Sequence, residues 1–175
     1  MSLVEDLKNQ NLFQEMTGDE LSKIAPVLQL MSVAKGQFVF KENDSTRGIY
    51  MLLSGKVEIK RKLQLDTKTK MLIMLRNLQS DEVRHTAQGW ENRFAIIEAG
   101  NFFGELSVIE NRKKHSAEAI AIENAELALL KTEDFNELEM THPETMVKLM
   151  KSVAKAMSNN VRLLDKRILK ALMGQ

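Results

Sequence analysis

The hydrophobic periodicity of the chain changes twice, and these changes constrain the fold more than any other feature of the sequence. Apolar residues recur at helical spacing in about the first thirty residues and again after residue 131, whereas stretches between residues 36 and 131 alternate apolar and polar residues as strands do. Near the start, Thr17 and Glu20 have capping-box spacing, and Pro26 should end or kink the helix that they begin. This order predicts an α+β chain, mainly β, whose short strands form a double-stranded β-helix or jelly roll.

The clearest strand patterns flank tight turns. KGQFVFKEN places Phe38 and Phe40 on one face, and GIYMLLSGKVEIKRK predicts two strands that meet at the turn of Ser54 and Gly55. Strand patterns return in RFAIIEAG and in SAEAIAIENAELALLK. Many short strands joined by sharp turns are typical of a sheet that rolls up on itself.

Residues 62–92 do not fit one pattern. Leu72, Leu75 and Leu78 would share a helical face, yet MLIML is also a plausible buried strand. SDEVRHTAQG could form a short helix capped by Ser80. We therefore expect residues 62–92 to form an extended hairpin or an insertion in the roll.

The last third of the chain predicts a long helix. Thr132 should cap a short helix, TEDFNELEM, and Thr141 and Glu144 have capping-box spacing at the start of the next one. No Gly or Pro interrupts residues 144–172, and the apolar stripe of this helix is Met146, Met150, Val153, Met157, Val161, Leu164, Ile168 and Leu172. An unpaired stripe of this length would be an exposed apolar patch, so we expect a homodimer in which this helix meets a second copy of itself.

The composition excludes several classes of protein. A chain of 175 residues can form one domain with a sizeable core, and its net charge of +1 gives no overall field that would attract nucleic acid or membranes. The sequence has no cysteine, which suits a reducing compartment, and no apolar run long enough to span a bilayer, and its start lacks the apolar core of a signal peptide. We expect a cytoplasmic protein without a membrane partner.

Patterns of catalytic and metal-binding residues are also missing from the sequence. His85 and His142 have no second ligand at metal spacing. No Ser-His-Asp arrangement, pair of carboxylates or Gly-rich phosphate loop stands out. We therefore expect a protein that is not an enzyme and needs no cofactor.

One stretch, EAGNFFGELSVIENRKKHSAEAIA, combines features of a ligand site. Glu105 follows Gly104 on a turn between an aromatic pair and an apolar run, and four basic or near-basic side chains follow at residues 112–115. Glu105 is either a surface charge or a hydrogen-bond acceptor held in a pocket. Residues 112–115 are either a solvated loop or the cationic wall of an anion site.

The order of elements and this stretch together resemble the cyclic nucleotide-binding domain. This is the β-roll shared by catabolite-activator-type bacterial regulators, protein kinase A regulatory subunits and nucleotide-gated channels. The resemblance extends over nearly the whole chain. KGQFVFKEND resembles a strand segment of the family, with Asn43 where Gly is usual, and GIYMLLSGKVEI resembles one of its hairpins. EAGNFFGELSVI resembles its phosphate-binding cassette, with five residues in register: Gly100, Phe103, Gly104, Glu105 and Leu106.

The resemblance implies a role for the cassette residues. In the family, backbone N–H groups of the cassette's short helix bind the cyclic phosphate, and Gly104 would let the backbone approach it closely. Glu105 would accept a hydrogen bond from the ribose 2′-hydroxyl, the group that marks a ribonucleotide. A family arginine further along the chain pairs with the phosphate.

The chain departs from the family at that arginine. An ungapped alignment puts His115 there, followed by Ser116, and puts Glu118 where kinase-type domains carry a Ser or Thr. A neutral imidazole offers one donor where arginine offers several and a charge, which could weaken the binding of a buried anion by about 1.5–3 kcal/mol, unless residues 113–114 compensate. Glu118 would repel a phosphate if it faced the pocket. The same alignment puts Asn160 beside the purine, although a lone Asn in a helix pair can instead fix the dimer register.

These observations predict a non-catalytic regulatory domain, residues 1–140, that resembles cAMP- or cGMP-binding modules and is followed by the long helix, residues 141–175, coupled to the ligand. The expected ligand is a cyclic nucleotide or a related small anion, and the expected site residues are Phe103, Gly104, Glu105, Leu106, His115, Ser116 and Asn160. One alternative is a degenerate fold that no longer binds nucleotide and serves as a dimeric interaction scaffold. Another is a transcription regulator lacking its DNA-binding domain, because the chain as given has nothing with which to read DNA.

Overall fold

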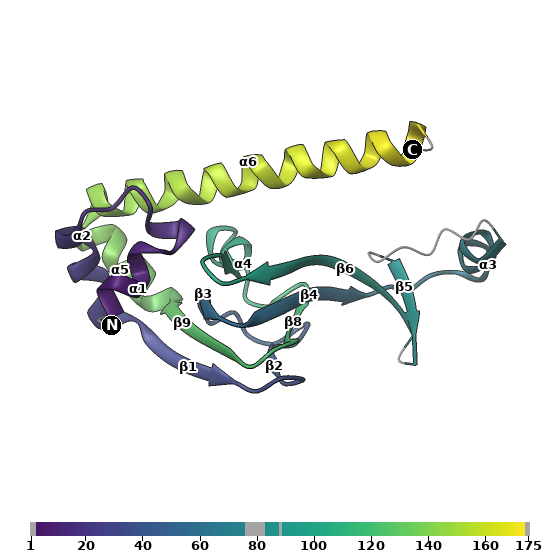
Figure 1. Ribbon diagram of the computed structural model, residues 1–175, viewed down its shortest axis with the longest axis horizontal. Helices are drawn as coiled ribbons and strands as arrows, with labels where there is room; N and C mark the ends of the chain where they lie inside the picture. The colour runs from purple at the N-terminus through teal and green to yellow at the C-terminus, as the bar shows by residue number, and fades with distance from the viewer. Residues whose placement is uncertain (1–2, 76–82, 88, 174–175) are drawn as a thin grey trace. The chain divides into compact units, whose positions relative to one another are not determined.

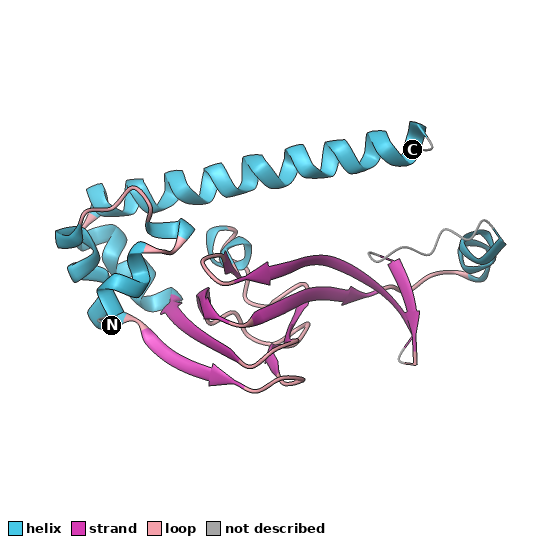
Figure 2. Cartoon of the chain, in the orientation of Figure 1, coloured by secondary structure: helices cyan, strands magenta, loops and turns pink. Residues whose placement is uncertain are grey.

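The chain divides into two compact units, seen in a computed structural model that describes residues 3–75, 83–87 and 89–173. The first unit contains residues 1–27 and 133–175, and the second contains residues 28–132. Every described strand lies in the second unit. Figure 2 draws these strands in magenta. The expected division into a domain at residues 1–140 and a helix at residues 141–175 is not tested by these two compact units, and it stays a prediction.

The second unit is a roll of two antiparallel sheets, with strand orders β1–β9–β3–β7 and β2–β8–β4–β6–β5 (Figure 1). The strands are β1 (Gln29–Val33), β2 (Phe38–Phe40), β3 (Gly48–Ser54), β4 (Lys56–Lys62), β5 (Val83–Thr86), β6 (Gly89–Glu98), β7 (Phe102–Phe103), β8 (Glu118–Ala121) and β9 (Ala125–Lys131). Strands far apart in sequence pair with one another, such as β1 with β9. The predicted α+β fold with a β-roll is confirmed.

Alternation along the strands produces the core of the roll. Ala119 pairs with Ile59 and Ala121 with Val57, so small side chains on β8 lie beside branched ones on β4. Large and small side chains fill the space between the sheets in this way, as a close-packed interior requires. The buried cluster contains Val33, Val39, Phe40, Tyr50, Leu52, Val57, Phe103, Ala119, Ala121, Ala125, Leu127 and Leu129.

The insertion between β4 and β6 combines a helix with a hairpin. MLIML belongs to α3 (Thr67–Leu75), so the helical alternative is correct and the buried strand is wrong. Asp66 begins this helix by accepting the Thr69 N–H at 2.9 Å. Ser80 and Leu78 lie outside the described residues. The short helix considered for SDEVRHTAQG is wrong over residues 83–86, because these residues form β5 and pair with β6.

The first unit consists of helices from both ends of the chain. They are α1 (Leu3–Lys8), the 3₁₀ turn η1 (Asn11–Phe13), α2 (Gly18–Ile24), the 3₁₀ turn η2 (Ala25–Val27), α5 (Thr132–Thr141) and α6 (Pro143–Met173). Thr17 and Glu20 form the predicted capping box of α2. Glu20 also accepts a hydrogen bond from Lys148 of α6 at 2.8 Å, so it ties the N-terminal helices to the C-terminal one.

The long helix α6 has the predicted extent, and its apolar stripe is buried only near the start. The buried apolar residues are Met146, Leu149 and Val153, with at most 3% of each exposed. Leu149 was not part of the predicted stripe. Further along, Val161 is 66% exposed and Leu164 is 57% exposed. The side chains of Ile168 and Leu172, which end the predicted stripe, lie outside the described ones.

A network of buried charges lies on the face of the five-stranded sheet that points away from the core. Lys60 on β4 alternates with core-facing neighbours, so its side chain lies on the opposite face. Its Nζ lies 2.9 Å from Glu91 of β6 and 3.5 Å from Glu118 of β8. All three residues are at most 9% exposed, so the attraction between them is weakly screened.

Arg84 of β5 extends this network to the insertion. Its guanidinium lies 2.5 Å from Glu58 and 3.3 Å from Glu91. Burial raises the pKa of Glu91, but hydrogen bonds and positive charge from Lys60 and Arg84 outweigh it, so the pKa is lowered overall. The charges are balanced within the sheet, and removal of one partner would leave a buried charge unpaired.

We expect Lys60→Met to lower the free energy of unfolding by about 3 kcal/mol, because methionine keeps most of the stem but removes the cation that lies beside Glu118 and leaves Glu91 with Arg84 alone. Urea denaturation measures the change. Lys56→Met on the same strand is the matched control, because Lys56 pairs with Glu123 in an exposed ion pair and its loss should cost about 0.5 kcal/mol or less. Equal losses in the two variants would contradict the buried network.

Candidate functional site

The predicted cassette folds as a tight turn that leads into a short helix. β7 ends at Phe103, Gly104 has a φ of 86°, and α4 (Glu105–Ile109) begins at the next residue. This left-handed conformation favours glycine. A Cβ on Gly104 would also meet the carbonyl oxygen of Gly48 at 3.0 Å and the ring of Tyr50 at 3.1 Å. Glycine is therefore needed here for both backbone conformation and space.

Glu105 is buried at the first position of α4, with 7% of the residue exposed. Burial raises the pKa of its carboxyl group, and a hydrogen bond from its own backbone N–H offsets part of that rise. The interpretation of Glu105 as a surface charge is therefore wrong. The carboxyl group is a hydrogen-bonding group held within the roll, available in principle to a ligand hydroxyl.

Aromatic side chains surround the cassette on its core side. The rings of Tyr50 and Phe103 stack with centroids 5.3 Å apart, and Phe40 lies 5.5 Å from Tyr50. His115 stacks on Phe40 with centroids 3.7 Å apart and an interplanar angle of 9°. The predicted replacement for the family arginine is thus packed into this aromatic cluster, with 3% of the residue exposed.

A turn at residues 41–44 holds the backbone of His115 on both sides. The Asn43 N–H donates to the carbonyl of His115, and the N–H of His115 donates to the carbonyl of Asp44, each at 2.9 Å. Asn43 has a φ of 71°, a conformation that Asn tolerates better than most non-glycine residues, which explains how it stands where the family usually has Gly. The Asp44 carboxylate closes the turn by accepting the Lys41 N–H at 2.8 Å.

The His115 ring is a weak candidate for an anion-binding cation. Its Nδ1 lies 3.4 Å from the Ser107 hydroxyl, and its Nε2 is buried without a hydrogen-bond partner among the described residues. Burial lowers the pKa of the imidazole, and the nearby charge of Asp44 only partly restores it. The ring is therefore neutral at pH 7, and it carries an unsatisfied polar atom beside the cassette.

The charged residues around His115 point elsewhere. Arg112, Lys113 and Lys114 are exposed, and Arg112 pairs with Glu110, so a solvated loop describes residues 112–114. Glu118 lies on the outer face of the sheet in the network with Lys60, not toward the core of the roll. The repulsion of a phosphate considered for Glu118 does not arise in this arrangement.

The structure brings Phe103, Gly104, Glu105 and His115 into one region of the roll, together with residues not singled out from the sequence. Those additional residues are Phe40, Tyr50, Asp44 and Ser107. The short apolar runs FVF and IYM were the signal that could have marked Phe40 and Tyr50 as core residues. Leu106 is 52% exposed and Ser116 is exposed. Asn160 is an exposed residue of α6 in the first unit.

Comparison with known proteins identifies what this arrangement is similar to. Residues 78–142 match the family model described as cyclic nucleotide-binding domain. Over 129 residues the chain is 26% identical to the cyclic AMP receptor protein of Thermus thermophilus, covering 74% of this chain and 49% of that protein. It is also 26% identical over 152 residues to the lysophospholipase NTE1 of Saccharomyces cerevisiae, covering 85% of this chain but 8% of that protein.

A solved structure supports the same assignment of the fold. The chain superposes on a cyclic nucleotide-binding domain from Methylobacillus flagellatus with a TM-score of 0.70 and 17% identity, covering 97% of this chain and 82% of the other. At this identity the likeness establishes the fold alone. The chain spans about half the length of one curated relative and 8% of the other, so neither relative describes it as a whole.

We expect Gly104→Ala to destabilise the protein by about 3 kcal/mol, because it adds left-handed strain and forces a Cβ against Gly48 and Tyr50. The control is Gly36→Ala, where φ is similarly positive at 84° but nothing beyond the neighbouring residues lies within 4 Å of the new Cβ, so only strain of about 1 kcal/mol remains. Thermal or urea unfolding measures both. Equal destabilisation would show that the cassette turn is not crowded.

We expect the imidazole pKa of His115 to lie below its ordinary value of 6.5, since burial disfavours the charged ring. Below about pH 6.5 the imidazole then takes up a proton more readily in the unfolded chain than in the folded chain. The contribution of His115 to the free energy of unfolding is therefore fully present above about pH 6.5 and decreases as the pH falls below that value. A nuclear magnetic resonance titration gives the pKa, and His115→Gln should remove this part of the pH dependence. A pKa at or above 6.5 would overturn the expectation.

Proposed function

We propose that this chain is a non-catalytic sensing domain for a cyclic nucleotide such as cAMP or cGMP. The chain has the fold of cyclic nucleotide-binding domains and matches their family model over residues 78–142. The observation that carries this proposal is the buried carboxyl group of Glu105 directly after the left-handed turn at Gly104. A buried acceptor at a tight turn discriminates strongly between ligands with and without a matching hydroxyl, because an unpaired buried group is costly.

The proposed contacts follow the predicted assignment residue by residue. From the roll they are Phe103, Gly104, Glu105, Leu106, His115 and Ser116, and from α6 the contact is Asn160. Glu105 would accept the ribose 2′-hydroxyl, and the orphaned Nε2 of His115 would face the phosphate. A buried polar atom without a partner favours this role, because such atoms cost stability unless they serve a ligand or water.

His115 sets a condition on an anionic ligand. A neutral imidazole is a poor partner for a phosphate, but the phosphate's negative charge raises the pKa of the ring. Binding would therefore take up a proton, and affinity would rise as the pH falls from about 8 toward about 6.5. A domain with arginine at this position would show no such dependence, because the guanidinium is charged throughout this range.

Ligand binding on this proposal requires side chains to move. Phe103, Glu105 and His115 are 4%, 7% and 3% exposed, so a ligand reaches them only when neighbouring groups are displaced. Such a rearrangement gives the chain two states that a ligand can bias, and we propose that α6 responds to it. The proposal retains the expectation of a cytoplasmic regulatory protein.

We further propose a homodimer through α6. Its support is the apolar stripe that continues past the buried start of the helix, where Val161 and Leu164 are more than half exposed. A second copy of the same helix is the partner that buries such a stripe most simply. Asn160 lies beside Val161, so it could set the register of this pair as well as contact a purine.

Two alternatives have their own supporting observations. The tight stacking of His115 on Phe40 favours a degenerate site that no longer binds nucleotide, with the chain acting as an interaction scaffold. The relative from Thermus thermophilus, of which the chain spans 49%, favours a regulatory domain that controls a further part of a longer protein, such as a DNA-binding part. The thermal-shift experiment below separates the first alternative from the proposal.

We expect cAMP or cGMP at millimolar concentration to raise the melting temperature, because a ligand that binds only the folded state stabilises it by about 2.7 kcal/mol at one hundred times its Kd. 2′-Deoxy-cAMP should give a much smaller shift if Glu105 accepts the 2′-hydroxyl. Calorimetry at pH 6.5 and pH 8 should show tighter binding at the lower pH. No shift with any cyclic nucleotide would contradict the proposal.

His115→Arg tests the cation directly. We expect cyclic nucleotide affinity to rise about tenfold or more, because a charged hydrogen bond replaces a neutral one, and the pH dependence of binding should disappear. His142→Arg, between α5 and α6, is the matched control and should leave affinity unchanged. If His115→Arg fails to fold, the pH dependence of the native protein still decides the point.

A further inference from the structure

The helix of the insertion presents apolar side chains to solvent. On α3, Met71 is 56% exposed, Leu72 is 43% exposed and Met74 is 64% exposed. Met71 and Met74 are three positions apart and share one side of the helix, and Leu72 follows Met71 directly, so the exposed apolar surface extends around more than one side of α3. A patch of this kind on a soluble fold marks a surface that another molecule covers.

The exposed charges around this patch are mostly positive. Residues 61–75, here called the insertion tip, carry the exposed cations Arg61, Lys62, Lys68 and Lys70. Asp66 is the acid in this range, and its carboxylate is occupied by the backbone N–H and the hydroxyl of Thr69, at 2.9 and 2.7 Å. The net charge of +1 for the whole chain therefore hides a local excess of positive charge.

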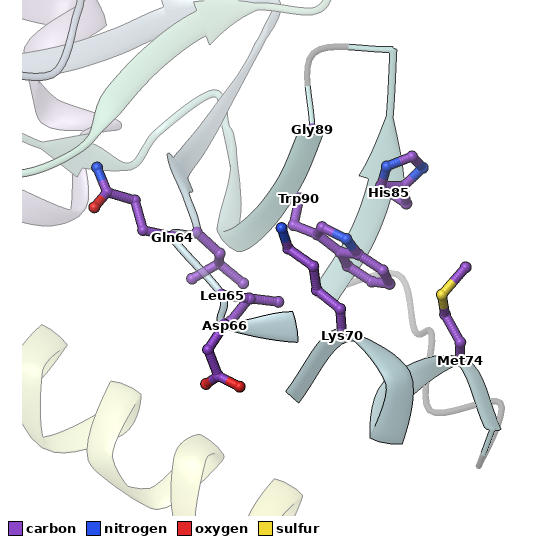
Figure 3. Close-up of a pocket in the computed structure, with 9 residues that line it drawn as sticks. Gln64, Leu65, Asp66, Lys70, Met74, His85, Gly89 and Trp90 are labelled. Carbon is purple, nitrogen blue, oxygen red and sulfur yellow. The ribbon is translucent and has the colours of Figure 1, made fainter. Parts of the chain in front are cut away.

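A groove of about 690 Å³ lies beside the apolar patch, between the insertion tip and the hairpin of β5 and β6. Its apolar lining includes Leu63, Leu65, Met74 and Trp90, and Lys70 and Asp66 stand among its polar residues. Figure 3 shows Lys70 and Met74 projecting from α3 on the side of the groove where Trp90 lies. Trp90 is 6% exposed and is the single tryptophan of the sequence.

The chemistry of the insertion tip fits an anionic lipid surface better than other partners. The groove is edged by exposed side chains such as Lys70 and Met74, so it cannot enclose a small molecule as ligand pockets do. Protein interfaces are depleted in lysine, whereas interfacial helices combine lysine with leucine-type residues. Lysine stems can lie along acyl chains while the ammonium groups meet phosphates, and a helix brings no unpaired backbone groups into lipid.

We propose that the insertion tip binds the surface of an anionic lipid bilayer. Met71, Leu72 and Met74 enter the boundary of the acyl chains, and Lys68 and Lys70 contact the head groups. Binding is peripheral, because no helix in the described part of the chain is long and apolar enough to cross a membrane. The proposal departs from the expectation of no membrane partner, which relied on the net charge of the whole chain. This inference does not depend on nucleotide binding.

Vesicle binding by the full chain tests the proposal. We expect flotation with vesicles of equimolar phosphatidylcholine and phosphatidylserine, and none with phosphatidylcholine alone. Binding should weaken as salt is added, because screening reduces the attraction of exposed charges. The emission of Trp90 should be quenched by vesicles with brominated acyl chains, because Trp90 lines the groove beside Met74, one of the inserting residues.

Two variants assign the contact. Lys68→Gln with Lys70→Gln should weaken binding to anionic vesicles about thirtyfold, since each cation near such a surface contributes about fivefold. Leu72→Ser with Met74→Ser should weaken it at least tenfold, because apolar surface no longer enters the lipid. The matched control, Lys35→Gln with Met140→Ser, changes an exposed lysine and a 78% exposed methionine outside the insertion tip and should bind as the native chain does.

Several results would overturn the proposal. These are absence of binding to phosphatidylserine vesicles, binding that the tip variants leave unchanged, and binding without any response from Trp90. Self-association that the tip variants abolish, measured by sedimentation velocity, would assign the patch to a protein contact instead. Each variant replaces exposed side chains, and its circular dichroism and melting temperature show that it remains folded. None of these readouts uses a nucleotide, so they stand apart from a failure of the proposed function.

Discussion

Both the core and the candidate site depend on the packing of the buried Tyr50 ring. Tyr50 is fully buried, pairs across β3 with Leu129 on one side and Phe103 on the other, and stacks on the Phe103 ring. The same ring limits the space over Gly104, so the turn of the cassette is shaped by a core residue. Burial raises the pKa of the Tyr50 hydroxyl, which keeps it neutral inside the roll. The packing of the sheets and the position of Glu105 are therefore coupled, because a shift of the Tyr50 ring would disturb the core and the turn at Gly104 together.

The local distribution of charged side chains describes this protein better than its net charge does. The two faces of the five-stranded sheet differ completely: one is apolar core, and the other carries Lys60, Glu91 and Glu118 in mutual contact and nearly inaccessible to solvent. The insertion tip has the opposite arrangement, with exposed cations and few acids. A formal charge of +1 describes neither region. Burial decides which charges a partner can meet, and this information becomes available only when the strands are paired.

Much of the architecture could be predicted from local patterns, and the failures have physical causes. The capping box of Thr17 and the long helix were predictable because caps and 3.6-residue periodicity act within a few residues. MLIML was ambiguous because a short apolar run suits a helix or a buried strand, and only the surrounding chain decides. For the site, the turn at Gly104 was predictable from residue types, but the stacking of His115 on Phe40 and the outward face of Glu118 depend on pairings between distant strands.

The roll is inserted in the sequence between the two parts of the helical unit. The chain leaves the helical unit at residue 27 and returns to it at residue 133, so two covalent connections join the units. Close to these crossings, Gln29 and Leu129 are paired on neighbouring strands, so the connections emerge side by side. The pairing of β1 with β9 therefore closes the roll at the edge where the chain both enters and leaves it. A substitution that broke this strand pair would disturb both ends of the roll at once, although it would lie far from the cassette in sequence.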